Sequence, residues 1–328
     1  MPEAVAPADG AVIRQLADGR FHSGEELGAL LGISRAGVWK RLQRLERLGL
    51  AIESVRGKGY RIPGGLSLLD EGAVRAAGGA SLQALDIHLL EVTQSTNADA
   101  LTLSAGGLPR PLAILAEYQS AGRGRRGRDW QSPYGSNLYV SLACQFSGGA
   151  AVLEGLSLAV GVAVAETLAA TGLGERVQLK WPNDLWVGGR KVGGILVELA
   201  GEMDGRCVPV IGVGINCAMP QAAAQQIDQP WTDLARELGA PVDRNQLAGS
   251  LLAALLEMLA VFRAQGFAGL RERWQALDGC QGKAVNLLLG ERRIHGVARG
   301  VNEQGALLLE VDGSIERFHG GEMSLRLA

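Results

Sequence analysis

Two segments of the chain carry side chains suited to chemistry on an anion. Residues 122–130 read GRGRRGRDW, and residues 180–184 read KWPND. The glycines of the first segment let the backbone adopt positive φ and approach a ligand closely, while its arginines bring permanent positive charges that can clamp phosphate oxygens. Those arginines are Arg123, Arg125, Arg126 and Arg128. We therefore predict a phosphate-binding loop, but not a Walker A loop, because GxxxxGK[ST] occurs nowhere in the sequence.

A basic, glycine-rich string is also typical of a surface loop that touches nucleic-acid backbone. Its position favours a ligand site. The predicted strand LAILAEYQ at 112–119 precedes the loop, and the predicted strand NLYVSLA at 137–143 follows it. The loop therefore lies at the end of a sheet, where binding residues are common, and Trp130 could stack on a base or cover a ligand.

A cluster of hydroxyl and amide groups lies at 91–97, where EVTQSTN ends a strand and begins a helix. Ser95, Thr96 and Asn97 at that helix N-terminus suit a small polar group of a ligand. Serine and threonine at such positions usually cap the helix, so we expect Ser95 or Thr96 to be the N-cap. Capping and ligand contact are compatible.

The segment 180–199, KWPNDLWVGGRKVGGILVEL, predicts a hairpin with its turn at Gly188 and Gly189. Lys191 then begins a strand and could stabilise negative charge on a transferring carboxylate or phosphate. A solvated surface lysine is the other interpretation. Two asparagines complete the polar set: Asn183 before the hairpin, and Asn216 in a glycine-containing bend where it could simply be a turn residue.

These residues need a framework, and the sequence predicts one in three parts. Strand patterns near 86–92, 112–117, 137–145, 177–180, 192–198 and 207–215, with helical patterns at 151–171 and 245–265, predict a mixed α/β domain over 84–275. A connector at 64–83, with a short helix, precedes it. Residues 276–328 predict five short strands in a small β-barrel, which could be purely structural.

Residues 1–63 predict a winged helix-turn-helix. Ser23 and Glu26 form a capping box, Gly32 makes a tight turn, and Ser34 begins a cationic helix. AIESV, RGKG and YRI then predict a hairpin with a basic tip. The residues expected to contact DNA are Ser34, Arg35, Trp39, Lys40, Arg44, Arg56 and Lys58. A three-helix bundle with merely solvated charges is the alternative.

Charge and composition support this division. Residues 1–61 hold ten Lys or Arg against seven Asp or Glu, whereas the other 267 residues hold 22 against 27, so only the front part suits polyanions. The four cysteines are widely spaced and favour neither a zinc site nor a disulfide framework. The most apolar long stretch, 153–170, is interrupted by Glu154 and Glu166, and no signal-peptide pattern opens the chain. We expect a soluble cytoplasmic protein without membrane contact.

The motifs together carry a family resemblance. After the helix-turn-helix and wing, STN, EYQSAGRGRRGRDW, KWPNDL, RKVGGILVEL and GVGIN occur in the order of the bifunctional biotin protein ligase and biotin operon repressor family. The resemblance covers essentially the whole chain and is specific as a set. It implies an α+β multidomain fold: the winged domain, a central class II synthetase-like mixed sheet with helices, and a C-terminal SH3-like barrel.

The resemblance also implies an activity. The family makes biotinyl-5′-AMP from biotin and MgATP, then passes biotin to a lysine of the biotin carboxyl carrier protein of acetyl-CoA carboxylase. It further implies binding to operator DNA and a homodimer that biotinyl-5′-AMP induces. The apolar strand 192–198 is the segment that we expect to pair with its twin.

Site residues carry over in the same way. Those implied to contact biotin are Ser95, Thr96, Asn97, Gln119, Arg123, Gly124, Arg125 and Lys191. Those implied on the nucleotide side are Arg126, Arg128, Trp130, Asn183 and Asn216. Lys191, Arg123 and Arg126 would be catalytic, the two arginines facing phosphate, and Asp184 would be a magnesium ligand.

Three alternatives stay open at this stage. A lipoate ligase would have the same catalytic fold, although the winged domain and the GRGRRG loop argue against it. A non-catalytic regulator that only senses biotin or a nucleotide is the second. The third is a biotin ligase whose winged domain regulates nothing, since Lys40, Arg44, Arg56 and Lys58 argue only for a capacity to bind DNA.

Overall fold

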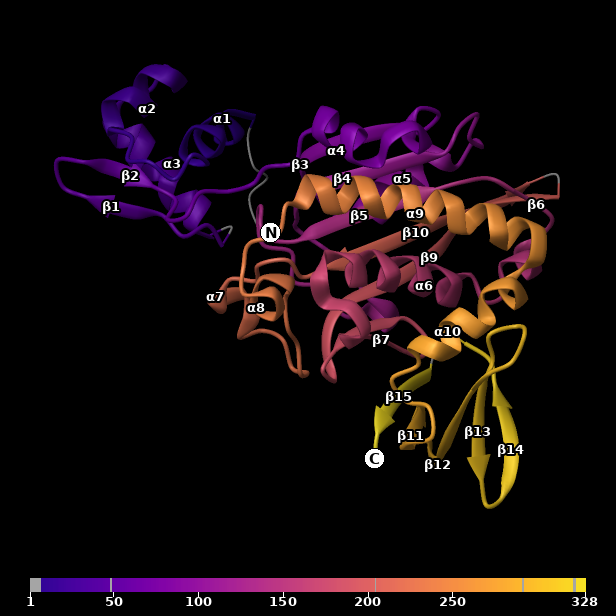
Figure 1. Ribbon diagram of the computed structural model, residues 1–328. Coiled ribbons are helices and arrows are strands. Elements are labelled where there is room, and N and C mark those ends of the chain that lie inside the picture. Colours follow the sequence, from indigo (N-terminus) through magenta and orange to yellow (C-terminus); the bar gives the residue numbers. More distant parts are fainter. Residues whose placement is uncertain (1–6, 48, 204, 291, 321–322) are drawn as a thin grey trace.

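The computed structural model describes residues 7–47, 49–203, 205–290, 292–320 and 323–328. Figure 1 shows a central α/β body, with the winged domain at one end and a small β body at the other. In the described residues the winged domain has a sheet of two strands, the central body one of eight and the C-terminal body one of five. The predicted fold class is confirmed.

The winged domain has the predicted element order, α1 (Pro7–Leu16), α2 (Gly24–Leu31), α3 (Arg35–Arg47), β1 (Glu53–Val55) and β2 (Gly59–Arg61). The capping box at α2 is formed: Glu26 N donates to Ser23 Oγ at 3.1 Å, and Ser23 N donates to Glu26 Oε2 at 2.7 Å. Ser34 Oγ accepts from Gly37 N at 3.3 Å and begins α3 as predicted. These caps satisfy backbone donors that a helix start leaves without partners.

The central sheet follows the order β3-β4-β5-β10-β9-β8-β7, with β6 paired to β10. Its strands are β3 (Asp86–Thr93), β4 (Leu112–Gln119), β5 (Leu138–Ala143), β6 (Phe146–Ser147), β7 (Val177–Lys180), β8 (Asp184–Val187), β9 (Arg190–Met203) and β10 (Arg206–Ile215). Among the strand pairs of this sheet that the described residues form, only β3 and β4 are parallel. Gly188 and Gly189 both have positive φ, at 58° and 73°, and form the predicted hairpin turn between β8 and β9.

Helices cover both faces of this sheet. Along β4, Ala113 and Leu115 point into the main core, whereas Leu112 and Ile114 belong to a second cluster on the opposite face. The main core contains α6 (Leu156–Leu168), α9 (Arg244–Gln265) and α10 (Arg271–Leu277); the second cluster contains α5 (Thr96–Ser104). Short helices α7 (Gln221–Ala224) and α8 (Leu234–Leu238) follow β10. Alternation along the strand thus explains the two layers.

Two helical stretches in the described part of the chain are long and apolar enough to cross a membrane, 150–176 and 244–265. In their most apolar windows, 67% and 50% of the residues are buried inside the protein. Helices that form the core of a water-facing domain have the same length and composition, and both stretches pack in the main core.

The connector at 64–83 contains the expected short helix, α4 (Glu71–Gly78), followed by a 3₁₀ turn at Gly79–Leu82. Val74 and Leu82 are fully buried in the main core. Gly78 and Gly249 pack backbone to backbone, because a Cβ at Gly249 would lie 2.7 Å from Gly78 N. The second half of the connector is therefore packed against α9 and is not a flexible linker.

A buried ion pair anchors the first half of the connector. Arg244 Nη2 lies 2.7 Å from Glu117 Oε2, and both side chains are buried. Arg244 also donates to the carbonyl of Ser67, and Leu69 N donates to Glu117 Oε1 at 2.5 Å. Since Glu117 belongs to β4, the chain that leaves the winged domain is tied to the strand that ends at Gln119.

The segment 192–198 of β9 was expected to pair with the same segment of a second copy of the chain. Its first residues are not at an edge of the sheet. Residues 192–194 lie between β8 and β10, because β8 pairs with β9 as far as Gly194. From Leu196 to Met203, β10 is the neighbour recorded among the described residues. Only the second part of the expected segment 192–198 therefore offers an open edge.

The C-terminal body is a five-stranded antiparallel sheet of order β14-β13-β12-β11-β15, which confirms the predicted strand number. Its strands are β11 (Ala284–Leu289), β12 (Arg292–Val301), β13 (Leu307–Val311), β14 (Ser314–Phe318) and β15 (Met323–Leu327). Trp181 Nε1 donates to Gly305 O at 3.1 Å and ties this body to the central domain.

Candidate functional site

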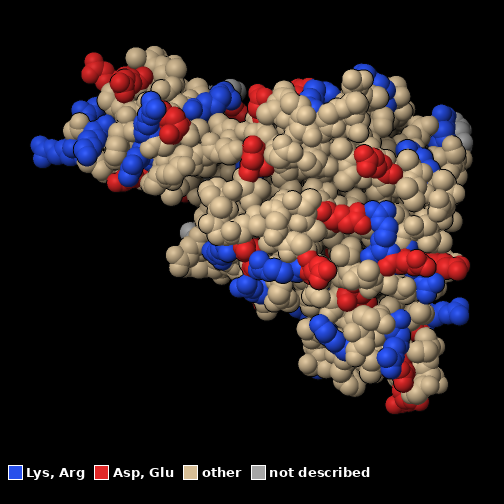
Figure 2. Space-filling model, in the orientation of Figure 1, with Lys and Arg blue, Asp and Glu red and all other residues tan. Residues whose placement is uncertain are grey.

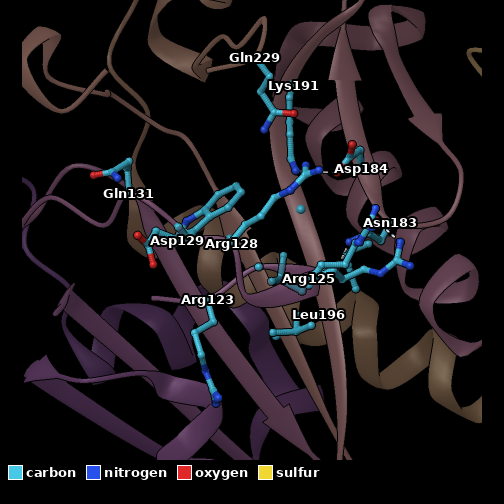
Figure 3. Close-up of a pocket in the computed structure, with 18 of the residues that line it drawn as sticks. Arg123, Arg125, Arg128, Asp129, Gln131, Asn183, Asp184, Lys191, Leu196 and Gln229 are labelled. Carbon is cyan, nitrogen blue, oxygen red and sulfur yellow. Dashed lines mark hydrogen bonds and ion pairs between the residues drawn. The ribbon is translucent and has the colours of Figure 1, made fainter. Parts of the chain in front are cut away.

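One cavity of about 550 Å³ gathers the candidate residues of the central domain. The structure brings together on its walls Ser95, Thr96, Asn97, Gln119, Arg123, Gly124, Arg125, Arg126, Arg128, Trp130, Asn183, Asp184, Lys191 and Asn216. Figure 3 shows Arg125 and Arg128 of the arginine loop lying close to Asn183, Asp184 and Lys191. Segments as distant in the sequence as Ser95 and Asn216 thus form a single site.

The helix start at 95–97 forms the buried polar end of the cavity. Ser95 is the N-cap residue of α5, as predicted, but its side chain makes no capping hydrogen bond. Gln119 Oε1 takes that role by accepting from Thr96 N at 3.0 Å. Ser141 Oγ donates to Asn97 Oδ1 at 2.6 Å. The Ser95 hydroxyl therefore stays available for a ligand.

Two glycines of β10 make room for side chains over the sheet. A Cβ at Gly212 would lie 2.4 Å from Asn97 Oδ1, and one at Gly214 would lie 2.7 Å from the Trp130 ring. The indole thus lies directly on the strand backbone, with its buried Nε1 making no hydrogen bond in the described structure. A flat aromatic ring in this place can stack on a planar ligand.

Asp184 holds two lysines at the other end of the cavity. Lys191 Nζ lies 2.6 Å from Asp184 Oδ1, and Lys180 Nζ lies 2.8 Å from Oδ2. Burial alone would raise the pKa of Asp184, but the two ammonium groups outweigh it and lower this pKa to about 2. Asp184 is therefore a carboxylate at every physiological pH.

The side chains of the arginine loop point to different parts of the cavity. Arg125 donates to Asn183 Oδ1 at 3.1 Å and to Met323 O at 3.3 Å, so it joins the loop to β15. Arg126 is exposed and adopts the left-handed conformation (φ 60°, ψ 32°), which costs a non-glycine residue energy. Arg128 reaches toward Lys191 and Asp184 (Figure 3).

Arg123, which was expected to face phosphate, lies beside an acidic side chain in this structure. Its guanidinium lies 3.6 Å from Glu198 Oε1. In Figure 3 it points away from Lys191 and Asp184. Glu198 also accepts from Asn97 Nδ2 at 2.7 Å, so the Arg123 side chain belongs to the polar end of the cavity in this structure.

The two asparagines hold the walls of the cavity in place. Asn183 Nδ2 donates to Ile195 O at 2.7 Å, and Asn216 Nδ2 donates to Thr232 O at 3.0 Å. Each fastens one segment of the wall to another, so their amide groups have structural partners as well as a place on the cavity surface.

Several wall residues were missed by reasoning from the sequence. They are Lys180, residues 226–229, Trp231 and residues 323–325 of β15. Ser141 and Glu198, which hydrogen-bond to the wall residue Asn97, were missed as well. Lys180 stands in the KWPND segment, so the motif itself carried a signal. The contribution of β15 had none, because nothing in that strand differs from an ordinary strand pattern. The C-terminal body is therefore more than a structural cap.

The winged domain presents a cationic end. Arg35, Trp39 and Lys40 of α3 are exposed, as are Arg56 and Lys58 at the wing tip. Figure 2 shows Lys and Arg side chains protruding at the far end of this domain, where Figure 1 places the β1–β2 hairpin. Ser34 is used as the cap of α3.

Arg44 was expected to contact DNA, and the structure contradicts this prediction. Its guanidinium pairs with the fully buried carboxylate of Asp9 in α1, which Arg41 Nη1 also approaches to 3.1 Å. A charge that neutralises a buried carboxylate is turned inward and is not offered to phosphate. The exposed positions of α3 instead include Gln43, between the buried Leu42 and the partly buried Arg44.

If Arg56 and Lys58 contact DNA and Arg44 does not, then substitutions at these positions should have different effects on DNA binding and on stability. We expect Arg56→Ala with Lys58→Ala to reduce the salt dependence of binding to non-specific duplex DNA by about two units of slope, one per lost phosphate contact. Arg44→Ala leaves that slope unchanged and lowers the thermal stability of the winged domain, because Asp9 loses a partner. Fluorescence anisotropy over a salt series measures the slope, and an equal loss of slope in Arg44→Ala would contradict the assignment.

The architecture defines a class that joins a helix-turn-helix domain to a ligase-type α/β domain. A model of the biotin/lipoate A/B protein ligase family matches residues 89–216, an HTH domain model matches residues 11–61, and a model of the biotin protein ligase C-terminal domain matches residues 281–326. These matches agree with the three bodies in the structure.

Relatives span the whole chain. The bifunctional ligase/repressor BirA of Salmonella typhimurium is 44% identical over 97% of both chains, and that of Escherichia coli is 43% identical over the same share. The biotin protein ligase of Aquifex aeolicus, solved with biotin and ATP, has a TM-score of 0.62 at 27% identity and covers 74% of this chain and 99% of its own. The chain belongs to the bifunctional biotin protein ligase and repressor family.

Proposed function

We propose that the protein activates biotin with ATP and transfers it to a lysine of a biotin carboxyl carrier protein, and that it represses biotin genes by binding operator DNA. The observation that carries the ligase function is the single cavity in which a buried hydroxyl and amide end faces a cationic end across the sheet. That polarity matches biotin, which has a hydrogen-bonding head and a carboxylate that must meet ATP.

The cavity suits the first reaction in detail. The head of biotin fits among Ser95, Thr96, Asn97 and Gln119, so its carboxylate extends toward Lys191. ATP lies with adenine on Trp130 and phosphates against Arg126 and Arg128. The carboxylate oxygen then attacks the α-phosphorus, pyrophosphate leaves, and fixed cations stabilise the charge that develops on the phosphoryl oxygens.

The second reaction requires an intact acyl phosphate. Closing the arginine loop over the cavity would exclude water until a carrier lysine arrives. That lysine attacks the biotinyl carbonyl, AMP leaves, and an amide forms. We place Arg123 at the biotin side of this closed site, in keeping with its pairing to Glu198.

Magnesium enters with ATP in this scheme rather than through Asp184. Both carboxylate oxygens of Asp184 are engaged by lysines, so the residues as they stand do not offer it as a direct ligand. Among the residues described, no group of three metal-binding side chains occurs. Mg²⁺ bound to ATP would supply charge neutralisation at the phosphates.

Pyrophosphate release from MgATP tests the ligase function. We expect release with biotin and not with lipoate, followed by labelling of a biotin carboxyl carrier domain. Release with lipoate would identify a lipoate ligase. The absence of release with either acid, in protein that binds biotin, would identify a non-catalytic sensor.

The repressor function needs a dimer on DNA. The open edge of β9 from Leu196 to Met203 can pair with a second copy, and unpaired strand edges favour such pairing. We propose that biotinyl-5′-AMP induces this dimer in the cytoplasm. A sedimentation experiment that shows only monomer at saturating adenylate would reject it, and loss of operator binding alone would leave a ligase with a non-regulatory winged domain.

A further inference from the structure

The cationic end of the cavity holds three largely buried charged groups, and the proposed reaction gives no role to one of them, Lys180. Only 8% of the Lys180 side chain, 12% of Asp184 and 15% of Lys191 is exposed. Burying an ammonium group is costly unless a partner compensates it. One carboxylate can neutralise only one of the two lysines, so the cluster keeps a net positive charge.

The sheet fixes the place of each group. Lys180 of β7 and Asp184 of β8 are opposite each other in the antiparallel register, and Asp184 is opposite Gly194 of β9. The Lys191 side chain lies over Gly194, where a Cβ would be in ordinary van der Waals contact at 3.4 Å from both Lys191 Cε and Nζ. Lys180 Nζ rests 4.8 Å from the centre of the Trp186 ring. Lys180 is thus held by its own strand pair and by a ring contact.

We propose that Lys180 is a positioning residue for adenylation. By occupying Asp184 Oδ2, it leaves Asp184 a single oxygen with which to hold Lys191. Lys191 then keeps donors and positive charge directed at the cavity, where its Nζ lies 5.5 Å from the centre of the Trp130 ring. The inference rests on the proposed ligase function and adds a residue to it.

The reason is the geometry of a carboxylate. If Lys180 is absent, both oxygens of Asp184 can turn to Lys191 and bind it in a chelating pair. That pair is neutral and is drawn toward β8, so the field at the reacting carboxylate and α-phosphate falls. Displacements of about 1 Å at a reacting group can cost about a hundredfold in rate.

The experiment is single-turnover formation of biotinyl-5′-AMP by the full chain with biotin and MgATP. We expect Lys180→Met to lower the rate at saturation by about tenfold to a hundredfold, with half-saturating biotin and ATP concentrations within about threefold of the native values. Lys180→Arg restores most of the rate, because a guanidinium can still occupy Asp184 Oδ2. Lys283→Met is the matched control, since that lysine binds Gly279 O and lies outside the cavity wall.

Different outcomes would overturn the proposal. A raised half-saturating ATP concentration with an unchanged maximal rate would make Lys180 a substrate-binding residue. Failure of Lys180→Arg to recover any rate, at native thermal stability, would also reject the positioning role.

A crystal structure of Lys180→Met gives a test that does not depend on turnover. We expect Asp184 to bind Lys191 with both oxygens, and a Lys191 that stays on Oδ1 alone would overturn the inference. If the native protein released no pyrophosphate at all, the ligase function would fail, and this structure would still decide what Lys180 does to Lys191.

Discussion

Lys191→Met is expected to lower single-turnover formation of biotinyl-5′-AMP by about 10²- to 10³-fold, the usual cost of removing one preorganised charge from a transition state. Lys191 Nζ is the cation that Asp184 holds at the cavity, and it reaches over the Trp130 ring. Methionine keeps the length of the side chain and removes its charge. The fold should persist, because Asp184 retains its pairing with Lys180.

The second reaction supplies the control. Transfer of biotin from added biotinyl-5′-AMP to a carrier domain should fall much less than adenylation, because attack on the acyl carbonyl no longer requires the approach of a carboxylate to ATP. Pyrophosphate release and carrier labelling measured on the same preparation separate the two steps. An unchanged rate of adenylate formation would sink the role given to Lys191.

Local sequence signals predicted what local interactions decide. The Ser23 and Glu26 box, the Ser34 cap and the Gly188–Gly189 turn each rest on contacts within a few residues, so a short string determines them. The order of strands along the central domain followed from runs of apolar residues. The motifs also marked the cavity, because ligand-binding loops concentrate glycine and charge in a short stretch.

Contacts between distant residues were not predictable in this way. Asp9 in α1 gave no sign that it would take Arg44 from the DNA-facing set, since pairing depends on how two helices cross. Glu198 likewise pairs with Arg123, although the two residues are 75 positions apart in the sequence. The sequence shows which side chains are charged, but the fold determines which of them form ion pairs.

The contacts between the winged domain and the central domain also join residues that are distant in the sequence, so they could not be predicted either. Tyr134 follows the arginine loop, is buried, and packs in the core cluster of the winged domain. Gly135 N donates to Glu117 O at 3.0 Å. The segment that follows the arginine loop, the strand that ends at Gln119 and the connector at Ser67–Asp70 therefore meet at Glu117.

Arg244→Met is expected to lower the free energy of unfolding by about 3–5 kcal/mol, because it leaves the buried carboxylate of Glu117 without its cation. It also removes the donors to Ser67 O, so the connector should become sensitive to proteolysis near 67–70. Denaturant unfolding and limited proteolysis of the full chain measure the two effects.

A double-mutant cycle identifies the cause. Glu117→Gln combined with Arg244→Met removes both charges and should recover part of the stability lost in the single variant, because no unpaired buried charge remains. Connector cleavage should persist, since the contact with Ser67 O is still absent. If the double variant is destabilised by the full sum of the single effects, then Glu117 and Arg244 do not act as a pair, and the connector is held by the packing of α4 on α9 instead.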